Sequence, residues 1–179
     1  PVLASFAQAW PDVVVEIVAS EELVDLAKEG FDAGIRLGEF IAADMVAVAL
    51  TPSFRYAIVA SPGYLERRGR PVVPADLGAH SCIRMRRASG VVAPWRLQQG
   101  GQPLEVAVGG PLVVNDFPTM LGAALGDVGL AQLPQPIAAA EVREGRLEEV
   151  LADFASTSPG VFLYHPGRRQ VLPKLRAFI

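Results

Sequence analysis

Residues 31–50 read FDAGIRLGEFIAADMVAVAL, and residues 161–166 read VFLYHP. The first stretch contains two runs of the strand type, Phe31–Leu37 and Met45–Leu50, and the second is a run typical of a buried strand. Between them, residues 54–151 carry strands and helices of their own. A chain that leaves one α/β unit, builds a second and returns to the first forms two lobes joined by two crossings. Such a molecule has a cleft, and clefts bind small ligands.

The composition favours a packed protein that does not bind nucleic acid by itself. The chain has 179 residues, 51% of them hydrophobic, which is enough for one large domain or two small lobes. The net charge is −3, from 16 basic and 19 acidic residues, whereas phosphate binding needs a clustered basic surface. One cysteine allows no internal disulfide, and no apolar run reaches the roughly 18 residues of a membrane span. No signal peptide opens the chain, so we expect a cytoplasmic protein without membrane contact.

The first lobe is predicted to contain a βαβ unit. Val13–Ala19 is a continuous apolar run, typical of a strand covered on both faces. Ser20 is placed to cap a helix that Gly30 ends, and the Phe31–Leu37 strand follows. Two strands joined by a helix in this way pair in parallel, so the sheet is expected to be parallel here. Thr51-Pro52-Ser53 then breaks the chain and marks the first crossing.

The second lobe is predicted from alternating strands and helices. Its strands are expected at Phe54–Ala60, Ser81–Met85, Trp95–Leu97, Val106–Val108, Pro111–Asn115, Gly129–Leu133 and Arg146–Leu151, and its helices begin at Ser61-Pro62, Phe117 and Pro134. The polar stretch Asp153–Gly160 marks the second crossing. The expected organisation is therefore 1–52 for the first part of lobe I, 53–154 for lobe II, and 155–179 for the return to lobe I.

Catalytic machinery is not visible in the sequence. His80 and His165 are the only histidines, and Cys82 shares a strand face with His80 without any local motif that would activate it. Two distant histidines and one cysteine give no metal-ligand spacing. The glycines at Gly34 and Gly38 lack the lysine and hydroxyl of a phosphate loop. We therefore predict no catalytic residue, no metal ligand and no cofactor, and interpret the cysteine and both histidines as structural.

Helix starts at the ends of strands are better candidates for binding. Ser20 follows one predicted strand, and Asn115, Asp116 and Phe117 follow another at the start of a helix, where backbone N–H groups attract anions. Asn115 and Asp116 could equally cap that helix, and the two roles are compatible. Arg36 is a charge inside the apolar strand GIRLG. It either lines the cleft or pairs with a buried carboxylate, because an unpaired buried charge is costly.

The order of several segments along the chain carries a family resemblance. The segments are Trp10-Pro11-Asp12 with VVVEI, then VDLAKEGFDAGIRLG, MVAVAL, YAIVASPGYLERRGRPVVPADLGAHSCIRMR, GPLVVND, GLAQLP, GRLEEVL, VFLYHP and PKLRAFI. Each segment alone is weak, but their order and spacing together are specific. In this order, the chain resembles the effector-binding domain of LysR-type transcription regulators, nearly end to end.

The resemblance implies a type-II periplasmic-binding-protein fold, in which two Rossmann-like lobes close on a small effector. A helix-turn-helix DNA-binding domain normally precedes this domain, and DNA would be bound only through it. The family also begins the domain with a strand that this chain is expected to lack, because Pro1 falls inside the following helix. The block from VASPGYL to HSCIRMR implies an organic-acid or aromatic effector. The family forms dimers, so we expect a homodimer or a tetramer.

The family's effector contacts can be transferred by matching position. They fall near Ser20, near Arg84 to Arg87, and near Asn115 to Phe117, with Arg36 as a neighbour. Phe117 and Met85 are expected to supply apolar wall. The candidate effector-binding residues are Ser20, Arg36, Arg84, Met85, Asn115, Asp116 and Phe117.

Two alternative functions remain open from the sequence. One is a solute-binding protein of a transport system with the same bilobal fold, which a secretory leader on the gene would favour and an upstream helix-turn-helix would exclude. The other is a bilobal α/β enzyme of the deaminase or dehydratase kind. That enzyme would need a strongly perturbed His, Cys or Glu in its cleft.

Overall fold

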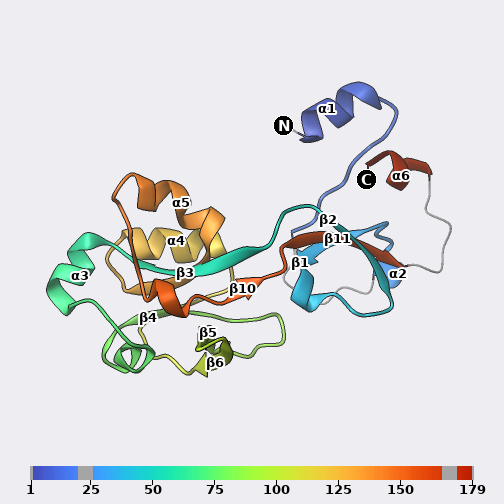
Figure 1. The fold of residues 1–179 in the computed structure, drawn as a ribbon. Helices are drawn as coiled ribbons and strands as arrows, with labels where there is room; N and C mark the ends of the chain where they lie inside the picture. The colour runs from blue at the N-terminus through green and yellow to red at the C-terminus, as the bar shows by residue number, and fades with distance from the viewer. Residues whose placement is uncertain (1, 20–25, 167–172, 179) are drawn as a thin grey trace. The chain divides into compact units, whose positions relative to one another are not determined.

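The computed structural model describes residues 2–19, 26–166 and 173–178 (Figure 1). Contacts divide the chain into two compact units. The first unit comprises residues 1–52 and 160–179, and the second comprises residues 53–159. The chain therefore passes from the first unit to the second and back again.

The return to the first unit lies at 159/160 rather than at the expected 154/155. Strand β10 (Thr157–Ser158) pairs antiparallel with β3 (Phe54–Ala60). The Ser156 hydroxyl donates a hydrogen bond to the Arg96 carbonyl at 2.7 Å. These bonds hold residues 155–159 in the second unit, and a polar composition alone does not reveal them.

The first unit is built on a three-stranded sheet with the order β1-β11-β2. Its elements are α1 (Val2–Ala9), α2 (Leu26–Glu29), β1 (Gly34–Leu37), the 3-10 turn η1 (Gly38–Phe40), β2 (Met45–Ala49), β11 (Val161–Pro166) and α6 (Pro173–Phe178). The returning strand β11 lies between β1 and β2 and is antiparallel to both. Helices α1 and α6 meet through an edge-to-face contact of Phe6 and Phe178, with ring centroids 5.1 Å apart.

The prediction of a parallel βαβ unit in this lobe was wrong. Residues 13–19 form no strand in the structure, and the side chain of Val14 is 93% exposed. An apolar run indicates a tendency to be buried, but it does not determine which partner covers it. The middle position of the sheet is taken instead by β11, which arrives from the far end of the chain and runs in the opposite direction.

Gly34 in β1 allows the aromatic ring of Tyr164 to lie across the strand. The two residues are paired across the sheet. A Cβ at position 34 would come within 2.6 Å of the Tyr164 ring, and that side chain is only 7% exposed. Because the ring is buried, it has little room to move away, so this site in the small core requires a residue without a side chain.

We expect Gly34→Ala to lower the free energy of unfolding by about 1–3 kcal/mol, because the added methyl group overpacks the site. Urea unfolding followed by circular dichroism measures the change. Gly122→Ala is the control, since a Cβ there meets nothing within 4 Å and its position in a helix favours alanine by about 1 kcal/mol. Equal stability of Gly34→Ala and the wild type would contradict this account of the pair.

The second unit is built on a mixed sheet with the order β10-β3-β8-β4-β7, and β9 also pairs with β3. The remaining elements are α3 (Pro62–Arg68), η2 (Pro74–Ala79), β4 (Cys82–Met85), β5 (Trp95–Gln99), β6 (Gln102–Val106), β7 (Val113–Val114), α4 (Phe117–Leu125), β8 (Leu130–Pro134), α5 (Gln135–Arg143), β9 (Glu148–Val150) and η3 (Ala152–Phe154). Strand β3 is antiparallel to β8, whereas β4 is parallel to both β8 and β7.

Each face of this sheet has its own layer of cover. Helices α4 and α5 lie on one face, and α3 and the β5–β6 hairpin lie on the other (Figure 1). Alternate residues of β3 divide between the two cores, with Ile58 in the hairpin-side cluster and Val59 in the helix-side cluster. The sheet is therefore buried on both sides, as its nearly continuous apolar strands predict.

The predicted helix start at Ser61-Pro62 is confirmed. The Ser61 hydroxyl accepts the Tyr64 N–H at 3.2 Å, and Pro62 occupies the first turn, where no N–H is needed. Ser61 also donates to the Asp127 carboxylate, which accepts a second bond from Arg67 at 2.9 Å. These bonds lower the pKa of Asp127 below its usual value. They tie the start of α3 to the turn after α4.

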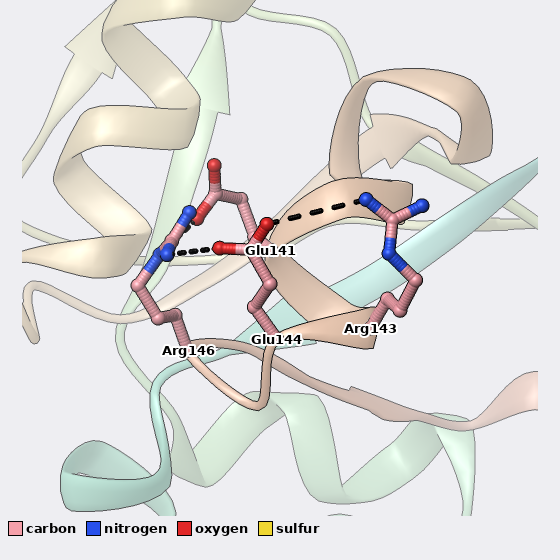
Figure 2. Close-up of polar contacts among 4 residues, drawn as sticks. All are labelled: Glu141, Arg143, Glu144 and Arg146. Atoms are coloured by element: carbon pink, nitrogen blue, oxygen red, sulfur yellow. Dashed lines mark hydrogen bonds and ion pairs between the residues drawn. The ribbon is translucent and has the colours of Figure 1, made fainter.

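Ion pairs close the C-terminal end of α5 (Figure 2). The Arg146 guanidinium donates to the carboxylates of Glu141 and Glu144, and Arg143 lies 4.0 Å from the other oxygen of Glu144. The bond from Arg146 lowers the pKa of Glu141. Because the Arg143, Glu144 and Arg146 side chains are about half or more exposed, the network sets the geometry of the turn more than it stabilises the fold.

Candidate functional site

The carboxyl ends of β4 and β7 lie side by side in the second unit. The two strands run parallel, with Met85 opposite Val114. The Arg86 N–H donates to the Val114 carbonyl at 2.7 Å and extends the pairing by one residue. Beyond this point Asn115 leaves the sheet. In open α/β sheets, ligands bind at the carboxyl ends of the strands, so this edge is the candidate site.

Asp116 is the N-cap of α4, which begins at this edge. Its carboxylate accepts the Thr119 N–H at 2.7 Å. Asn115, one residue earlier, is exposed, and Phe117 is partly buried against the helix-side core. The turn therefore presents an amide to solvent beside an aromatic ring.

The helix end itself is a poorer anion site than the sequence suggested. Pro118 has no N–H group, and the N–H group of Thr119 already donates to the carboxylate of Asp116. That carboxylate also places a negative charge where an anion would bind. The positive charge at this edge comes instead from the arginines that follow β4.

The loop after β4 is closed by its own bonds. Arg87 N–H donates to the Val91 carbonyl at 2.9 Å, and Gly90 N–H donates to the Arg87 carbonyl at 2.8 Å. The Arg86 guanidinium donates to the Gly90 carbonyl at 2.7 Å. These bonds give the loop a defined shape and keep the Arg86 charge close to it.

The structure separates Arg84 from the other candidate residues. Its guanidinium donates to the Gly110 carbonyl at 2.9 Å, toward the amino end of β7 and away from Asn115. Its buried Nε makes no hydrogen bond to any residue that the structure describes. The candidates that the fold does bring together are Met85, Asn115, Asp116 and Phe117.

The chain as a whole matches a known family. The model of the family described as the LysR substrate binding domain matches residues 1–179. The chain belongs to this family. The family resemblance inferred from the order of the sequence segments is thereby confirmed. The predicted type-II periplasmic-binding-protein-like fold is the fold of this family and is confirmed as well.

Individual relatives of this LysR substrate-binding domain are longer proteins. A Pseudomonas aeruginosa protein named as a transcriptional regulator is 39% identical over 174 residues, which are 97% of this chain and 57% of the relative. The HTH-type transcriptional regulator PgrR of Escherichia coli is 34% identical over 180 residues, with 100% of this chain and 60% of the relative covered. The chain thus spans about 60% of the length of these relatives.

A solved structure supports the fold of this LysR substrate-binding domain. CrgA, a LysR-type transcriptional regulator from Neisseria meningitidis, matches with a TM-score of 0.82. The match covers 99% of this chain and 60% of that chain, at 24% identity. At this identity the likeness shows a shared fold.

Of the two candidate residues in the first unit, the structure describes Arg36 but not Ser20. Arg36 lies in β1 opposite Phe162 and is partly buried. Ser20 lies outside the described residues, so its predicted role as cap and effector contact stays a prediction. Neither residue belongs to the unit that contains the turn at Asn115.

The cysteine and histidine side chains lie in structural surroundings in this LysR substrate-binding domain. Cys82 is fully buried, and burial raises the pKa of its thiol to about 12. His80 Nδ1 lies 3.2 Å from the Tyr64 hydroxyl. The pKa of His80 is lowered, mainly by desolvation and to a smaller extent by the nearby Arg68 charge. His165 is 5% exposed within β11. None of these groups lies in the candidate turn.

Metal-binding clusters and membrane-spanning helices are both absent from the part of the chain that the structure describes. Within residues 2–19, 26–166 and 173–178, no group of three or more His, Cys, Asp or Glu side chains is placed to hold a metal ion. Over the same residues, no helix is long and apolar enough to cross a membrane.

Gln132 is a polar contact that the sequence analysis missed. It lies in the central strand β8, and its side-chain amide bonds to both backbone groups of Arg96. The signal was available, because a glutamine interrupts the apolar strand LAQLP just as Arg36 interrupts GIRLG. A polar side chain in a buried strand requires a partner.

We expect the thiol of Cys82 to react with iodoacetamide at least about 100-fold more slowly in the folded protein than in urea, because it is buried and its thiolate is scarce. Mass spectrometry of the labelled protein measures this at mildly alkaline pH. Cys82→Ser serves as the unlabelled control. Equal labelling rates with and without urea would contradict the burial of this thiol.

Proposed function

We propose that this chain is the ligand-sensing regulatory domain of a LysR-type transcription regulator. The observation that carries the proposal is the family match over residues 1–179, with relatives named as transcriptional regulators of the helix-turn-helix type. A small effector binds the domain, and a helix-turn-helix segment outside these 179 residues binds DNA. The protein works in the cytoplasm as a homodimer or tetramer, in which effector binding changes how the DNA-binding segments are presented.

The candidate turn supports an effector of mixed polar and apolar character. Asn115 offers an amide that both donates and accepts, Phe117 and Met85 offer apolar surface, and the loop at Arg86 and Arg87 supplies positive charge. A small organic acid or an aromatic carboxylate meets each of these groups with a complementary one.

The proposed role is binding without catalysis. The cysteine is buried with a raised thiol pKa, and His80 bonds to a tyrosine hydroxyl. The turn at the edge of β4 and β7 offers an amide, a capping carboxylate and an aromatic ring, which suit recognition. No cofactor is part of the proposal.

A solute-binding protein of a transport system is the alternative, since such proteins share the bilobal fold. The names of the relatives favour the regulator, because they denote helix-turn-helix proteins. Sequencing the reading frame upstream of Pro1 separates the two. A helix-turn-helix segment there supports the regulator, and a secretory leader supports the transport protein.

We expect Asn115→Ala to weaken effector binding about tenfold while leaving the fold intact, because Asn115 is exposed and the substitution removes only the polar contact that a bound ligand would cover. A thermal-shift screen of benzoate, salicylate, succinate and phenol first finds a ligand, and calorimetry then compares wild type and variant. A ligand at 100 times its Kd stabilises the domain by about 2.7 kcal/mol, which the screen detects. An unchanged binding curve for Asn115→Ala would remove this turn from the site.

Asp116 variants separate capping from contact. Asp116→Ala removes the cap and is expected to lower helix stability by about 1 kcal/mol, whereas Asp116→Ser keeps a capping oxygen. Weaker binding by both variants indicates that the carboxylate contacts the ligand. Weaker binding by the alanine variant alone indicates that Asp116 acts through the shape of the turn.

A further inference from the structure

Residues 93–97, here called the strap, connect two distant parts of the second unit. At its first end, the Ala93 N–H donates to the Met85 carbonyl at 2.9 Å, beside the candidate turn. At its other end, Leu97 forms an isolated antiparallel bridge with Ala155, next to the chain's return to the first unit. Trp95 and Leu97 are 3% and 2% exposed, so their side chains fix the strap in the hairpin-side core.

Gln132 holds the middle of the strap with both ends of its amide. Its Oε1 accepts the Arg96 N–H at 3.1 Å, and its Nε2 donates to the Arg96 carbonyl at 2.7 Å. This pair of bonds resembles one step of a β-ladder, although β5 pairs with β6 and not with β8. The direction of both bonds is fixed, so only a side chain that donates and accepts at this length fits.

The Arg96 carbonyl also bonds to the segment that leads the chain back to the first unit. The Arg96 carbonyl also accepts the Ser156 hydroxyl at 2.7 Å, and the Ser156 carbonyl accepts the Tyr56 N–H at 2.8 Å. Tyr56 lies in β3, the first strand after the chain enters this unit, and Ser156 directly precedes β10. Gln132, Arg96, Ser156 and Tyr56 thus form one continuous series of hydrogen bonds.

We propose that Gln132 is a positioning residue that holds the strap on β8 and keeps its Arg96 carbonyl in place for Ser156, so that a displacement at the carboxyl end of β4 is carried to Ser156 and β10. The strap joins Met85, at the candidate site, to the segment through which the chain leaves the unit. Its buried side chains make it stiff, and the Gln132 amide prevents it from sliding along β8. That an effector causes such a displacement rests on the proposed function, whereas the hydrogen bonds that hold the strap do not depend on it.

Hydrogen exchange of single amides in the 179-residue chain tests the tie without any ligand. Gln132→Met keeps the length of the side chain but removes both polar groups. We expect the protection of the Arg96 amide to fall at least about tenfold, and that of the Tyr56 amide, two bonds further on, to fall with it. Tyr64→Phe is the matched control, because it removes the hydroxyl that accepts the Ser81 N–H at 2.9 Å elsewhere in the same unit.

Gln132→Glu adds a reversible test of the two bonds. Its ionised carboxylate accepts from the Arg96 N–H but repels the Arg96 carbonyl, whereas the protonated acid can donate to that carbonyl as glutamine does. We expect protection of the Tyr56 amide to be low at neutral pH and to recover toward the wild-type value at about pH 5, because partial burial raises the pKa of the introduced acid. The wild type at each pH provides the reference.

The proposal fails if Gln132→Met exposes the Arg96 amide but leaves the Tyr56 amide as protected as in the wild type. It also fails if every amide of the unit loses protection equally, since that is a general loss of stability, or if Tyr64→Phe has the same effect on Tyr56. Failure of the effector screen with the tie intact would count against the proposed function alone.

Discussion

Gly160 is the residue on which the passage of the chain between its two units depends. Its φ is +116°, and a Cβ there would come within 2.7 Å of the carbonyl oxygens of Thr51 and Pro52. The Thr51 hydroxyl accepts the Val161 N–H at 2.9 Å, and the Val161 carbonyl accepts the Leu50 N–H at 2.9 Å. The outgoing and returning chains therefore lie in backbone contact, which only a residue without a side chain permits.

This contact explains features of both units. In the first unit, the returning chain continues directly from Gly160 into β11, which lies between β1 and β2 and is antiparallel to both. In the second unit, the same two chain segments continue as the paired strands β3 and β10. The same sheet also contains the parallel strands β4 and β7, whose carboxyl ends form the edge that we propose as the effector site.

Features that depend on neighbouring residues alone, such as the start of a helix, could be predicted from the sequence. Ser61 and Asp116 both cap helices, because a hydroxyl or carboxylate with a proline one or two residues later is a strong local start signal. The prediction failed where the outcome depends on distant partners. The run Val13–Ala19 is apolar but forms no strand, because the middle position of its sheet is taken by β11 from the far end of the chain. Gln132 could be noticed as a glutamine in an apolar strand, but its partner could not be predicted because it lies in a hairpin 36 residues away along the chain.

The most direct test of this account is hydrogen exchange at the paired crossings in Gly160→Ala. The added methyl group must push the returning chain away from Thr51, at a conformational cost of about 1–3 kcal/mol. The account predicts that the amides of Val161 and Leu50 lose protection, while that of Ala131 in the core of the second unit keeps it. Unchanged protection of Val161 and Leu50 in a variant as stable as the wild type would contradict it.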